Sequence, residues 1–512
     1  MPLNDCDNIL VRGVNWIGDA VMTMPAIRAL RLARRGARIT LLVKPWVAPL
    51  FEKDPNIDEI IPYLDEFRGI AGRIRLARGL RERHFCAALL LQNAFDAAAI
   101  TALAGIPDRA GYARDGRRWI LTQPVTFDAA AKRLHHIDYY LNLVSKTGLP
   151  APRSGPWMYL TLEERMAARG TLKGLSRPVV AINPGATYGS SKRWLPERFA
   201  GTAMRVLVEL GGSVLVLGGP SEKEIAAEIV RLIGERGEAG TDSRVRSVAG
   251  ATSLRELAAL ISESDLLITN DSGPMHIGYA VGTPVVAVFG STSPELTGPV
   301  GGGDVAIRKT LDCAPCFERE CRRNDLRCMD LVTSDEVFEA ARGRIGRRRA
   351  VFFDRDGTLC RDADYLSRME DLQIFPEIAE LKRLKERGLS LIGVSNQSGV
   401  ARGIVDQRFV EKVNGIFIDD YGFDAFYYCP HHPEEHCSCR KPEPGLLHRA
   451  RVEQGIDLKG SYVVGDKEID MVLAKTVGAR GILVRTGKDI FSPYADFVVD
   501  DLAGATEVIL QP

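Results

Sequence analysis

The chain has 512 residues, and at roughly 150 residues per domain this length predicts three to four compact domains. Hydrophobic residues make up 45% of the chain and charged residues 26%, an ordinary globular composition that excludes a disordered chain, collagen and a coiled coil. The 67 Lys and Arg residues balance the 66 Asp and Glu residues, and the net charge of +1 gives no global attraction to nucleic acid or to a membrane. We therefore expect no nucleic-acid partner, and any basic surface must be local.

The first residues, MPLNDCDNIL, lack the charged start, apolar core and cleavage site of a signal peptide. No apolar run approaches the ~18 residues of a membrane span, so we expect a soluble cytoplasmic protein. Disulfides are unusual in that compartment, and eight of the ten cysteines lie from Cys313 onward, seven of them in two short clusters. This distribution makes metal binding the first possibility to consider.

Short β-branched runs alternate with longer amphipathic stretches, a rhythm that predicts an α/β fold with parallel sheets. A first series has apolar runs at 9–12, 38–43 and 87–91 and is interrupted by a Pro- and Gly-rich passage at 148–155. A second series has runs at 179–183, 213–217, 266–269 and 285–289. A third series begins abruptly at Ala350, after a predicted helix at 334–344. We predict three domains, at residues 1–160, 161–346 and 347–512.

Candidate binding groups follow the strands of the first two series, where ligands of such sheets bind. The first βα turn, Gly18-Asp19, delivers one carboxylate to the mouth of a cleft, although Asp19 could instead cap the following helix. In the second series Asp271-Ser272-Gly273 opens a helix that carries His276, and the free N–H groups of such a helix suit a diphosphate. Lys192 could add a cation, and Asp271 or Glu222 could accept sugar hydroxyls. The glycines could also be simple turns and His276 a core residue, but several such groups at successive strand ends favour a binding site.

Together these motifs resemble the lipopolysaccharide heptosyltransferases, most closely the heptosyltransferase II branch. The resemblance rests on Gly18-Asp19, Asn183-Pro184-Gly185-Ala186, Lys192-Arg193-Trp194, Asn270-Asp271-Ser272-Gly273 and Met275-His276. It implies two Rossmann-like domains in the GT-B arrangement, which transfer heptose from ADP-heptose to a heptose of the lipopolysaccharide core acceptor with inversion at the anomeric carbon.

The resemblance also implies roles for the matching residues. Asp19 is expected to be the general base, and Asp271 and Glu222 are expected to contact the donor. The expected contacts to the diphosphate are Lys192, Ser272, Gly273 and His276. A helix N-terminus and a lysine can stabilise the departing ADP without a metal, and no Asp-x-Asp triplet follows a strand of these domains.

Two further features of this region leave alternatives open. Arginines gather in the first domain, where they form either a solvated helix face or a local field that attracts the anionic acceptor and the inner face of the inner membrane: Arg68, Arg73, Arg75, Arg78, Arg81, Arg83, Arg109, Arg114, Arg117 and Arg118. Four cysteines, Cys313, Cys316, Cys321 and Cys328, could ligate zinc or an iron–sulfur cluster, but their spacing fits no standard pattern. A structural metal and simple reduced thiols both remain open there.

The third series begins with a hydrophobic strand that ends in Asp354-Arg355-Asp356-Gly357. One carboxylate can attack phosphorus while the other protonates the leaving oxygen, and Mg²⁺ is needed because a carboxylate and a phosphate repel each other. Further polar groups follow later strands, at Ser395-Asn396, Arg440-Lys441 and Gly465-Asp466-Lys467, with Asp470 beyond. These motifs in this order resemble the haloacid dehalogenase phosphatases.

A second cysteine cluster lies between these motifs. Cys429-x-His431 followed by Cys437-x-Cys439 provides three thiolates and an imidazole, which suit a closed structural Zn²⁺ site. With its flanking segments, residues 396–403 and 439–442, this loop resembles D-glycero-D-manno-heptose 1,7-bisphosphate phosphatase, and the resembling families place the ligand at His431 rather than His432 or His436. Histidinol phosphatase has a similar loop, but the heptosyltransferase part of the chain favours heptose bisphosphate as substrate.

In the resembling phosphatases Asp354 is the nucleophile and Asp356 the acid/base. The implied substrate contacts are Ser395, Asn396, Arg440 and Lys441, and the implied Mg²⁺ ligands are Asp354, Asp466 and the carbonyl of Asp356. We therefore interpret the chain as a bifunctional enzyme of heptose metabolism. The alternative is a phosphatase that carries a catalytically silent nucleotide-sugar or lipopolysaccharide binding module.

Overall fold

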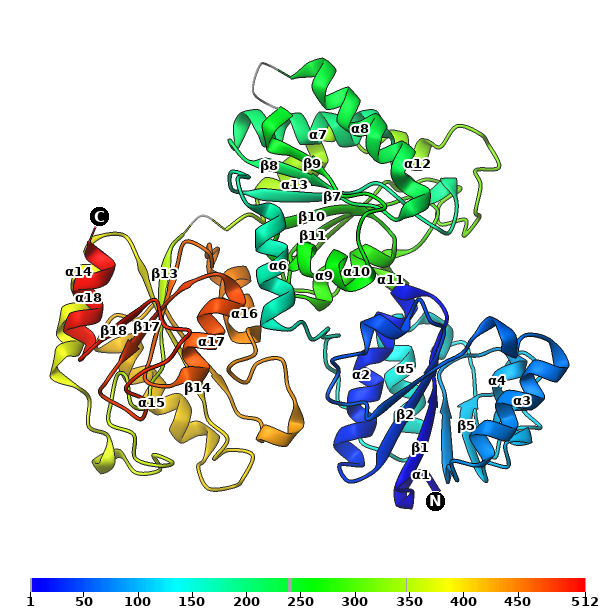
Figure 1. Ribbon diagram of the computed structural model, residues 1–512, viewed down its shortest axis with the longest axis horizontal. Coiled ribbons are helices and arrows are strands. Elements are labelled where there is room, and N and C mark those ends of the chain that lie inside the picture. The colour runs from blue at the N-terminus through cyan, green and yellow to red at the C-terminus, as the bar shows by residue number, and fades with distance from the viewer. Residues whose placement is uncertain (1, 238–241, 347, 512) are drawn as a thin grey trace. The chain divides into compact units, whose positions relative to one another are not determined.

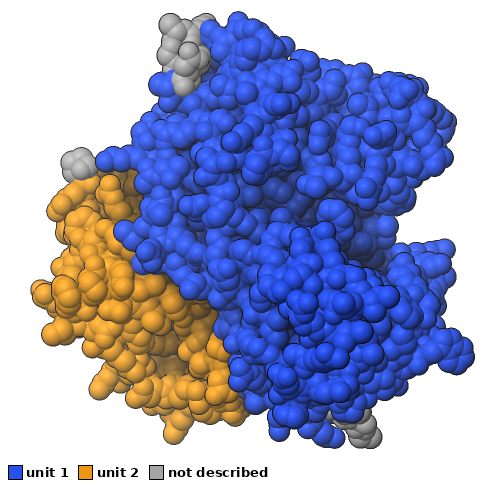
Figure 2. Space-filling model, turned by 45° about the vertical axis from the view of Figure 1, so that its right-hand side comes forward, with its two compact units in different colours: residues 1–343 blue, residues 344–512 orange. Residues whose placement is uncertain are grey.

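The computed structural model describes residues 2–237, 242–346 and 348–511 (Figure 1). The chain divides into two compact units, unit 1 at residues 1–343 and unit 2 at residues 344–512 (Figure 2). Within the described ranges no helix is both long and apolar enough to span a membrane. The predicted boundaries at 160/161 and 346/347 remain predictions, and residue 347 itself lies outside the described ranges.

Unit 1 begins with a six-stranded parallel sheet in the order β3-β2-β1-β4-β5-β6. Its strands are β1 (Asn8–Arg12), β2 (Arg38–Val43), β3 (Glu59–Pro62), β4 (Ala87–Leu90), β5 (Asp108–Tyr112) and β6 (Gln123–Val125). Its helices are α1 (Pro2–Asp5), α2 (Ile17–Ala33), α3 (Gly69–Arg81), α4 (Phe95–Leu103) and α5 (His136–Lys146).

The sheet corrects the expectation that disulfides are absent, because Cys6 and Cys86 form one. Cys6 precedes β1 and Cys86 precedes β4, and these two strands are direct neighbours, with Ile9 opposite Ala87. Their pairing therefore brings the two sulfurs together across 80 residues of sequence.

The second sheet of unit 1 has six parallel strands in the order β12-β11-β10-β7-β8-β9. The strands are β7 (Val179–Asn183), β8 (Ser213–Val216), β9 (Val245–Ser247), β10 (Leu266–Asn270), β11 (Val285–Phe289) and β12 (Val305–Arg308). The helices are α6 (Leu162–Leu172), α7 (Pro196–Glu209), α8 (Lys223–Arg236), α9 (Leu254–Glu263), α10 (Gly273–Ala280), α11 (Pro294–Thr297), α12 (Arg327–Asp330) and α13 (Ser334–Arg342). One buried hydrophobic cluster contains residues of both sheets, such as Ile9 and Val285.

Unit 2 contains a third six-stranded parallel sheet, in the order β15-β14-β13-β16-β17-β18. The strands are β13 (Ala350–Phe353), β14 (Ser390–Asn396), β15 (Ala425–Cys429), β16 (Tyr462–Gly465), β17 (Arg480–Val484) and β18 (Phe497–Val499). The helices are α14 (Lys382–Glu386), α15 (Gln407–Asp419), α16 (Gly445–Gln454), α17 (Glu468–Val477) and α18 (Leu502–Leu510). The predicted α/β class with parallel sheets is confirmed.

Buried ion pairs hold α6 against α9. Glu263 is 1% exposed, and its carboxylate accepts hydrogen bonds from Arg169 at 2.8 and 3.2 Å and lies 3.9 Å from the guanidinium of Arg165. Arg255 pairs with Glu164 and also donates to the carbonyl of Pro49 at 2.8 Å, which links the segment to the first sheet.

Glu263→Ala should lower the free energy of unfolding by about 3–5 kcal/mol, because it leaves a buried arginine without its counter-charge. Urea unfolding measures this change. The control is Glu235→Ala, which removes half of the exposed Arg231–Glu235 pair and should alter stability little. Equal effects of the two substitutions would contradict this account.

Candidate active sites

In unit 1 the start of α2 lies against the start of α10. A Cβ at Gly18 would lie 2.6 Å from the ring of His276, and a Cβ at Gly273 would lie 3.0 Å from the side chain of Ile17. Only glycine at positions 18 and 273 allows the two helices to approach this closely. The turn that carries Asp19 therefore meets the helix that carries His276.

Asp19 is not the cap of α2, because the N-cap residue is Trp16. Its Oδ1 lies 3.4 Å from Nδ1 of His136, the first residue of α5, and the two side chains are 31% and 39% exposed. His136 is not recognisable from the sequence as a site residue, because its only signal is its place at the start of an amphipathic helix. The carboxylate and the imidazole form a solvent-accessible pair that can accept a proton.

Asp271 forms a buried ion pair with Lys192. Its Oδ2 accepts hydrogen bonds from the Lys192 ammonium at 2.5 Å and from the hydroxyl of Thr292, also at 2.5 Å. Lys192 ends a short 3₁₀ helix, Ser190–Lys192, and its ammonium lies 4.8 Å from the ring centroid of Tyr188. The pair fixes one cation close to the first turn of α10.

The first turn of α10 has no side-chain cap; Pro274 has no N–H, and the Met275 N–H donates to the Ser272 carbonyl at 3.1 Å, which leaves the Gly273 N–H as the uncapped backbone group there. Ser272 is the N-cap, and its side chain makes no cap bond. His276 is buried, and its Nδ1 lies 2.7 Å from the hydroxyl of Tyr279. Burial lowers the pKa of His276 to about 4, so its ring is uncharged at neutral pH and can serve an anion only through a hydrogen bond.

Glu222 lies at the edge of this group. Its Oε2 accepts a hydrogen bond from the backbone of Gly219 at 2.7 Å, and its carboxylate packs on Gly185, where a Cβ would lie only 1.6 Å from Oε1. Asn183 connects Gly185 to the α10 turn, because its Nδ2 lies 3.3 Å from the Gly185 carbonyl and 3.4 Å from Ser272 Oγ.

The arginines of the first sheet mostly have partners inside the fold. Arg117 is fully buried and donates to the carbonyls of Tyr112 and Gln92. The arginines paired with carboxylates are Arg68, Arg73, Arg75 and Arg83. These contacts favour structural roles over a free basic field.

In unit 2 a buried lysine joins two carboxylates, Asp354 directly after β13 and Asp470 in the first turn of α17. The Lys441 ammonium lies 2.8 Å from Asp354 Oδ1 and 2.7 Å from Asp470 Oδ1, and it donates to the Val394 carbonyl at 3.1 Å. Burial lowers the pKa of Lys441, but the two carboxylates outweigh that effect and raise it. The lysine therefore stays charged beside Asp354.

Asp466 completes a group of three carboxylates. Asp354, Asp466 and Asp470 each offer an oxygen within 4.8 Å of the others, and Asp466 Oδ1 is buried without a hydrogen-bond partner. Burial, and then the charge of Asp354, raises the pKa of Asp466 to about 7. Gly357, at φ +92°, makes room, because a Cβ there would lie 2.3 Å from Asp466 Oδ2. Oxygen ligands with an unpaired buried member fit a divalent cation such as Mg²⁺.

Asp356 is held by two side chains that the sequence analysis did not assign. Arg355 donates to both carboxylate oxygens of Asp356 at 3.0 Å, and Gln397 donates to Oδ2 at 2.7 Å. Gln397 also donates to Ser395 Oγ at 2.8 Å. The predicted acid/base is therefore fixed beside Ser395.

Asn396 and Arg440, two further expected substrate contacts, differ in whether their side chains already have hydrogen-bond partners. Asn396 exchanges hydrogen bonds with the backbone N–H and carbonyl of Lys441, at 3.0 and 3.2 Å, so it positions that lysine. Arg440 has a buried guanidinium nitrogen, Nη1, without a hydrogen-bond partner, which leaves it available to an anion.

The predicted cysteine–histidine cluster also comes together. His431 Nδ1 lies 3.2 Å from Cys439 Sγ, and Cys437 Sγ lies 3.4 Å from both Cys429 Sγ and Cys439 Sγ. His432 instead caps the following 3₁₀ turn. The four side chains, Cys429, His431, Cys437 and Cys439, could hold a metal ion.

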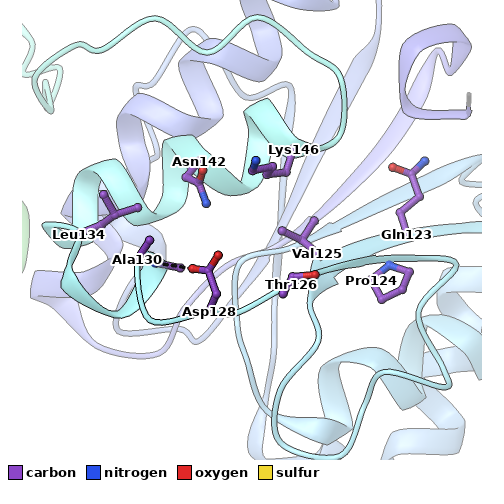
Figure 3. A pocket seen from close by; sticks show the side chains of 10 residues that line it. Gln123, Pro124, Val125, Thr126, Asp128, Ala130, Leu134, Asn142 and Lys146 are labelled. Carbon is purple, nitrogen blue, oxygen red and sulfur yellow. Dashed lines mark hydrogen bonds between the residues drawn. The ribbon is translucent and has the colours of Figure 1, made fainter.

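A cavity of about 640 Å³ opens between β6 and α5 (Figure 3). Asn142 and Lys146 line it from α5, and Asp128 accepts a hydrogen bond from the backbone of Ala131 at its wall. No predicted site residue lines this cavity, so the candidate sites lie at the strand ends instead.

Residues 73–326 match glycosyltransferase family 9 (heptosyltransferase), and residues 438–505 match a HAD-hydrolase-like family. Lipopolysaccharide heptosyltransferase 2 of Salmonella typhimurium is 31% identical over 312 residues, which is 59% of this chain and 87% of that protein. D-glycero-beta-D-manno-heptose-1,7-bisphosphate 7-phosphatase of Haemophilus ducreyi is 40% identical over 172 residues, 30% of this chain and 94% of that protein.

A solved structure, that of ADP-heptose LPS heptosyltransferase II of E. coli, is 26% identical, with a TM-score of 0.57. The match covers 66% of the present chain and 98% of the E. coli chain. This likeness confirms the predicted GT-B arrangement of two Rossmann-like domains.

Gly18→Ala should lower the free energy of unfolding by about 1–3 kcal/mol, because its methyl group overlaps the buried His276 ring and must push α2 from α10. Urea unfolding measures the change. Gly36→Ala is the matched control, because a Cβ at Gly36 meets nothing within 4 Å. An equally small effect at both positions would mean that the two helices do not depend on this contact.

Proposed function

Because the chain belongs to glycosyltransferase family 9 in its N-terminal part and to the haloacid dehalogenase-like hydrolases in its C-terminal part, we propose that it is a bifunctional enzyme of heptose metabolism. Unit 1 transfers heptose from ADP-heptose to a heptose of the lipopolysaccharide core, with inversion. Unit 2 removes the 7-phosphate from D-glycero-D-manno-heptose 1,7-bisphosphate, and the relative's β-configured substrate favours the β anomer. One observation carries the proposal: polar strand-end residues gather around a carboxylate in each unit, around Asp19 in unit 1 and around Asp354 in unit 2.

For the transfer, Asp19 takes the proton of the acceptor hydroxyl as that oxygen attacks the anomeric carbon. The bond from this carbon to the diphosphate oxygen breaks on the opposite face, and ADP leaves with the electron pair. Lys192, the first turn of α10 and His276 stabilise the departing charge. Asp271 holds the Lys192 ammonium in place at 2.5 Å, and Glu222 contacts the donor.

For the hydrolysis, Asp354 attacks phosphorus and Asp356 gives its proton to the departing sugar oxygen. Asp356 then takes a proton from the water that releases phosphate from Asp354. Lys441, Ser395 and Arg440 contact the phosphate. Asp354, Asp466 and the carbonyl of Asp356 would hold Mg²⁺, with Asp470 in reach, and the bound ion supplies the positive charge that lets a carboxylate approach a phosphate.

The cluster at Cys429 and His431 is proposed to hold Zn²⁺. Three sulfurs and one imidazole nitrogen complete a tetrahedral shell with no open position, so the ion supports the fold and takes no part in the reaction.

Asp19→Ala should reduce transfer by on the order of 10²–10⁴-fold, because it removes the base, while ADP-heptose binding stays largely intact. Turnover and calorimetric binding are measured on the same preparation. Asp7→Ala, which removes a carboxylate that is 85% exposed, serves as the control and should leave both unchanged. Undiminished transfer by Asp19→Ala would show that another group is the base.

Asp354→Asn keeps the side chain's size but removes the attacking charge, so phosphatase activity should fall by several orders of magnitude and transfer should not change. EDTA should reproduce the same split, because the transfer site relies on Lys192 and a helix N-terminus rather than on a metal ion.

Both activities are assayed on the full chain, with Asp420→Asn as an exposed carboxylate control in the same unit. A parallel loss of transfer in Asp354→Asn or in EDTA would mean that the sites are coupled or that transfer needs a metal.

A further inference from the structure

The carboxyl ends of β1 and β2 place two buried cations close to one aromatic ring. Arg12 ends β1, Lys44 directly follows β2, and the two strands are neighbours, with Arg12 opposite Leu42. Arg12 is 3% exposed and Lys44 is 7% exposed. The guanidinium carbon of Arg12 lies 5.1 Å from the ring centroid of Tyr63, and the ammonium of Lys44 lies 4.1 Å from it. We call Arg12, Lys44 and Tyr63 the cation cluster.

The groups bonded to Arg12 do not neutralise its charge. Its guanidinium donates to the carbonyls of Gly13 and Leu42, at 2.5 and 3.2 Å. It also donates to the side-chain oxygen of Asn15 at 3.2 Å, and its Nε is buried without a hydrogen-bond partner. All three acceptors are uncharged. The guanidinium therefore keeps its full positive charge in a place with little solvent.

Lys44 has still less compensation. Within the described part of the chain its ammonium makes no hydrogen bond, and the closest carboxylate oxygen, Asp65 Oδ1, is 3.9 Å away. That carboxylate is 67% exposed and lies nearer to Arg68, at 3.0 Å. The ammonium is held instead by the faces of Tyr63 and Trp46, whose ring centroids lie at 4.1 and 5.5 Å. Its three N–H donors are therefore available to an oxyanion from outside the protein.

The cation cluster adjoins the turn that leads to Asp19. Arg12 bonds to the side chain of Asn15, and the indole N–H of Trp46 donates to the Asn15 carbonyl at 2.9 Å. Trp16 comes next and is the N-cap of α2, whose third residue is Asp19. Trp16 and Trp46 are 55% and 49% exposed, so flat apolar surface is open to solvent here. The cluster therefore borders solvent beside the proposed base.

We propose that Lys44, in the field of Arg12, binds an oxyanion of the acceptor saccharide and so selects acceptors that carry a negative group near the attacking hydroxyl. This inference rests on the proposed transferase function. The oxyanion is a phosphate or a carboxylate, since both offer oxygens that form charge-assisted hydrogen bonds with an ammonium. Two buried like charges without matching carboxylates cost stability, so their presence is explained by a ligand that supplies the missing charge.

Lys44→Met keeps the length of the side chain and removes its charge. Its KM for a core acceptor should rise about tenfold, with kcat and the KM for ADP-heptose nearly unchanged, because the substitution removes a binding contact and not the base. Added salt should raise the acceptor KM of the wild type more than that of the variant. Lys53→Met, which changes an exposed lysine of the same unit, should match the wild type. An unchanged acceptor KM in Lys44→Met would overturn the proposal.

Modified acceptors identify the oxyanion. The wild type and Lys44→Met are compared on the intact core saccharide, on the same saccharide after its phosphates are removed, and on its carboxyl methyl esters. The treatment that abolishes the difference in KM between the two proteins names the group that Lys44 binds. If the difference survives both treatments applied together, Lys44 does not recognise a negative group and the proposal is wrong.

Urea unfolding separates a binding role from a structural one. Because Lys44→Met removes a charge that Arg12 repels, its unfolding midpoint should equal or exceed that of the wild type. A lower midpoint would show that the ammonium supports the fold and would contradict the proposal. If the wild type transfers no heptose, the transferase assignment fails. Calorimetric titration with the core saccharide then still tests the cluster, because Lys44→Met should bind it about tenfold more weakly than the wild type does.

Discussion

Parallel strands that are buried on both faces leave only their ends for chemistry, and this chain meets that constraint in three sheets. Strands β7, β10 and β13 are buried along their whole length, and the reactive groups begin with the residues that follow them. A carboxylate in such a place loses much of its hydration and needs a nearby positive charge. Asp271 finds it in Lys192, and Asp354 finds it in Lys441.

The two units differ in how fully their own side chains supply the positive charge that buried carboxylates require. At the proposed diphosphate site of unit 1 one buried carboxylate, Asp271, is matched by one lysine and one hydroxyl, so its charge is balanced by the protein's own side chains. In unit 2 three carboxylates lie together: the buried Lys441 pairs with Asp354 and Asp470, Lys467 lies 3.6 Å from Asp466 Oδ2, and Asp466 Oδ1 has no hydrogen-bond partner. The excess negative charge explains why only the second reaction is expected to require a divalent cation.

Most central strands and the strand-end motifs could be predicted from sequence because long apolar runs and local spacing are both visible there; the central strand β5, with the sequence DRAGY, has no such run and could not. The short edge strands β3, β6, β9, β12 and β18 were not, since they have three or four residues and little apolar pattern. Contacts between distant segments were also beyond reach. The Asp19–His136 pair spans 117 residues, and the Cys6–Cys86 disulfide depends on which strands are neighbours.

Some residues have a different role from the one that their local motif suggested. Asn396 follows a strand beside Ser395, yet its amide is committed to the backbone of Lys441. Arg117 belongs to a basic run in sequence, but it is fully buried and bonded to carbonyls. In both cases the partner lies in another part of the chain, so residue type and spacing could not distinguish a binding group from a structural one.

The central claim is that one chain serves two steps of heptose chemistry. The most direct test compares phosphate release from the β and α anomers of heptose 1,7-bisphosphate and from histidinol phosphate, beside heptose transfer from ADP-heptose, on one preparation of the full chain. The account predicts that heptose bisphosphate is hydrolysed far faster than histidinol phosphate and that the same preparation transfers heptose. Preference for histidinol phosphate, or no transfer from ADP-heptose to a core acceptor, would contradict it.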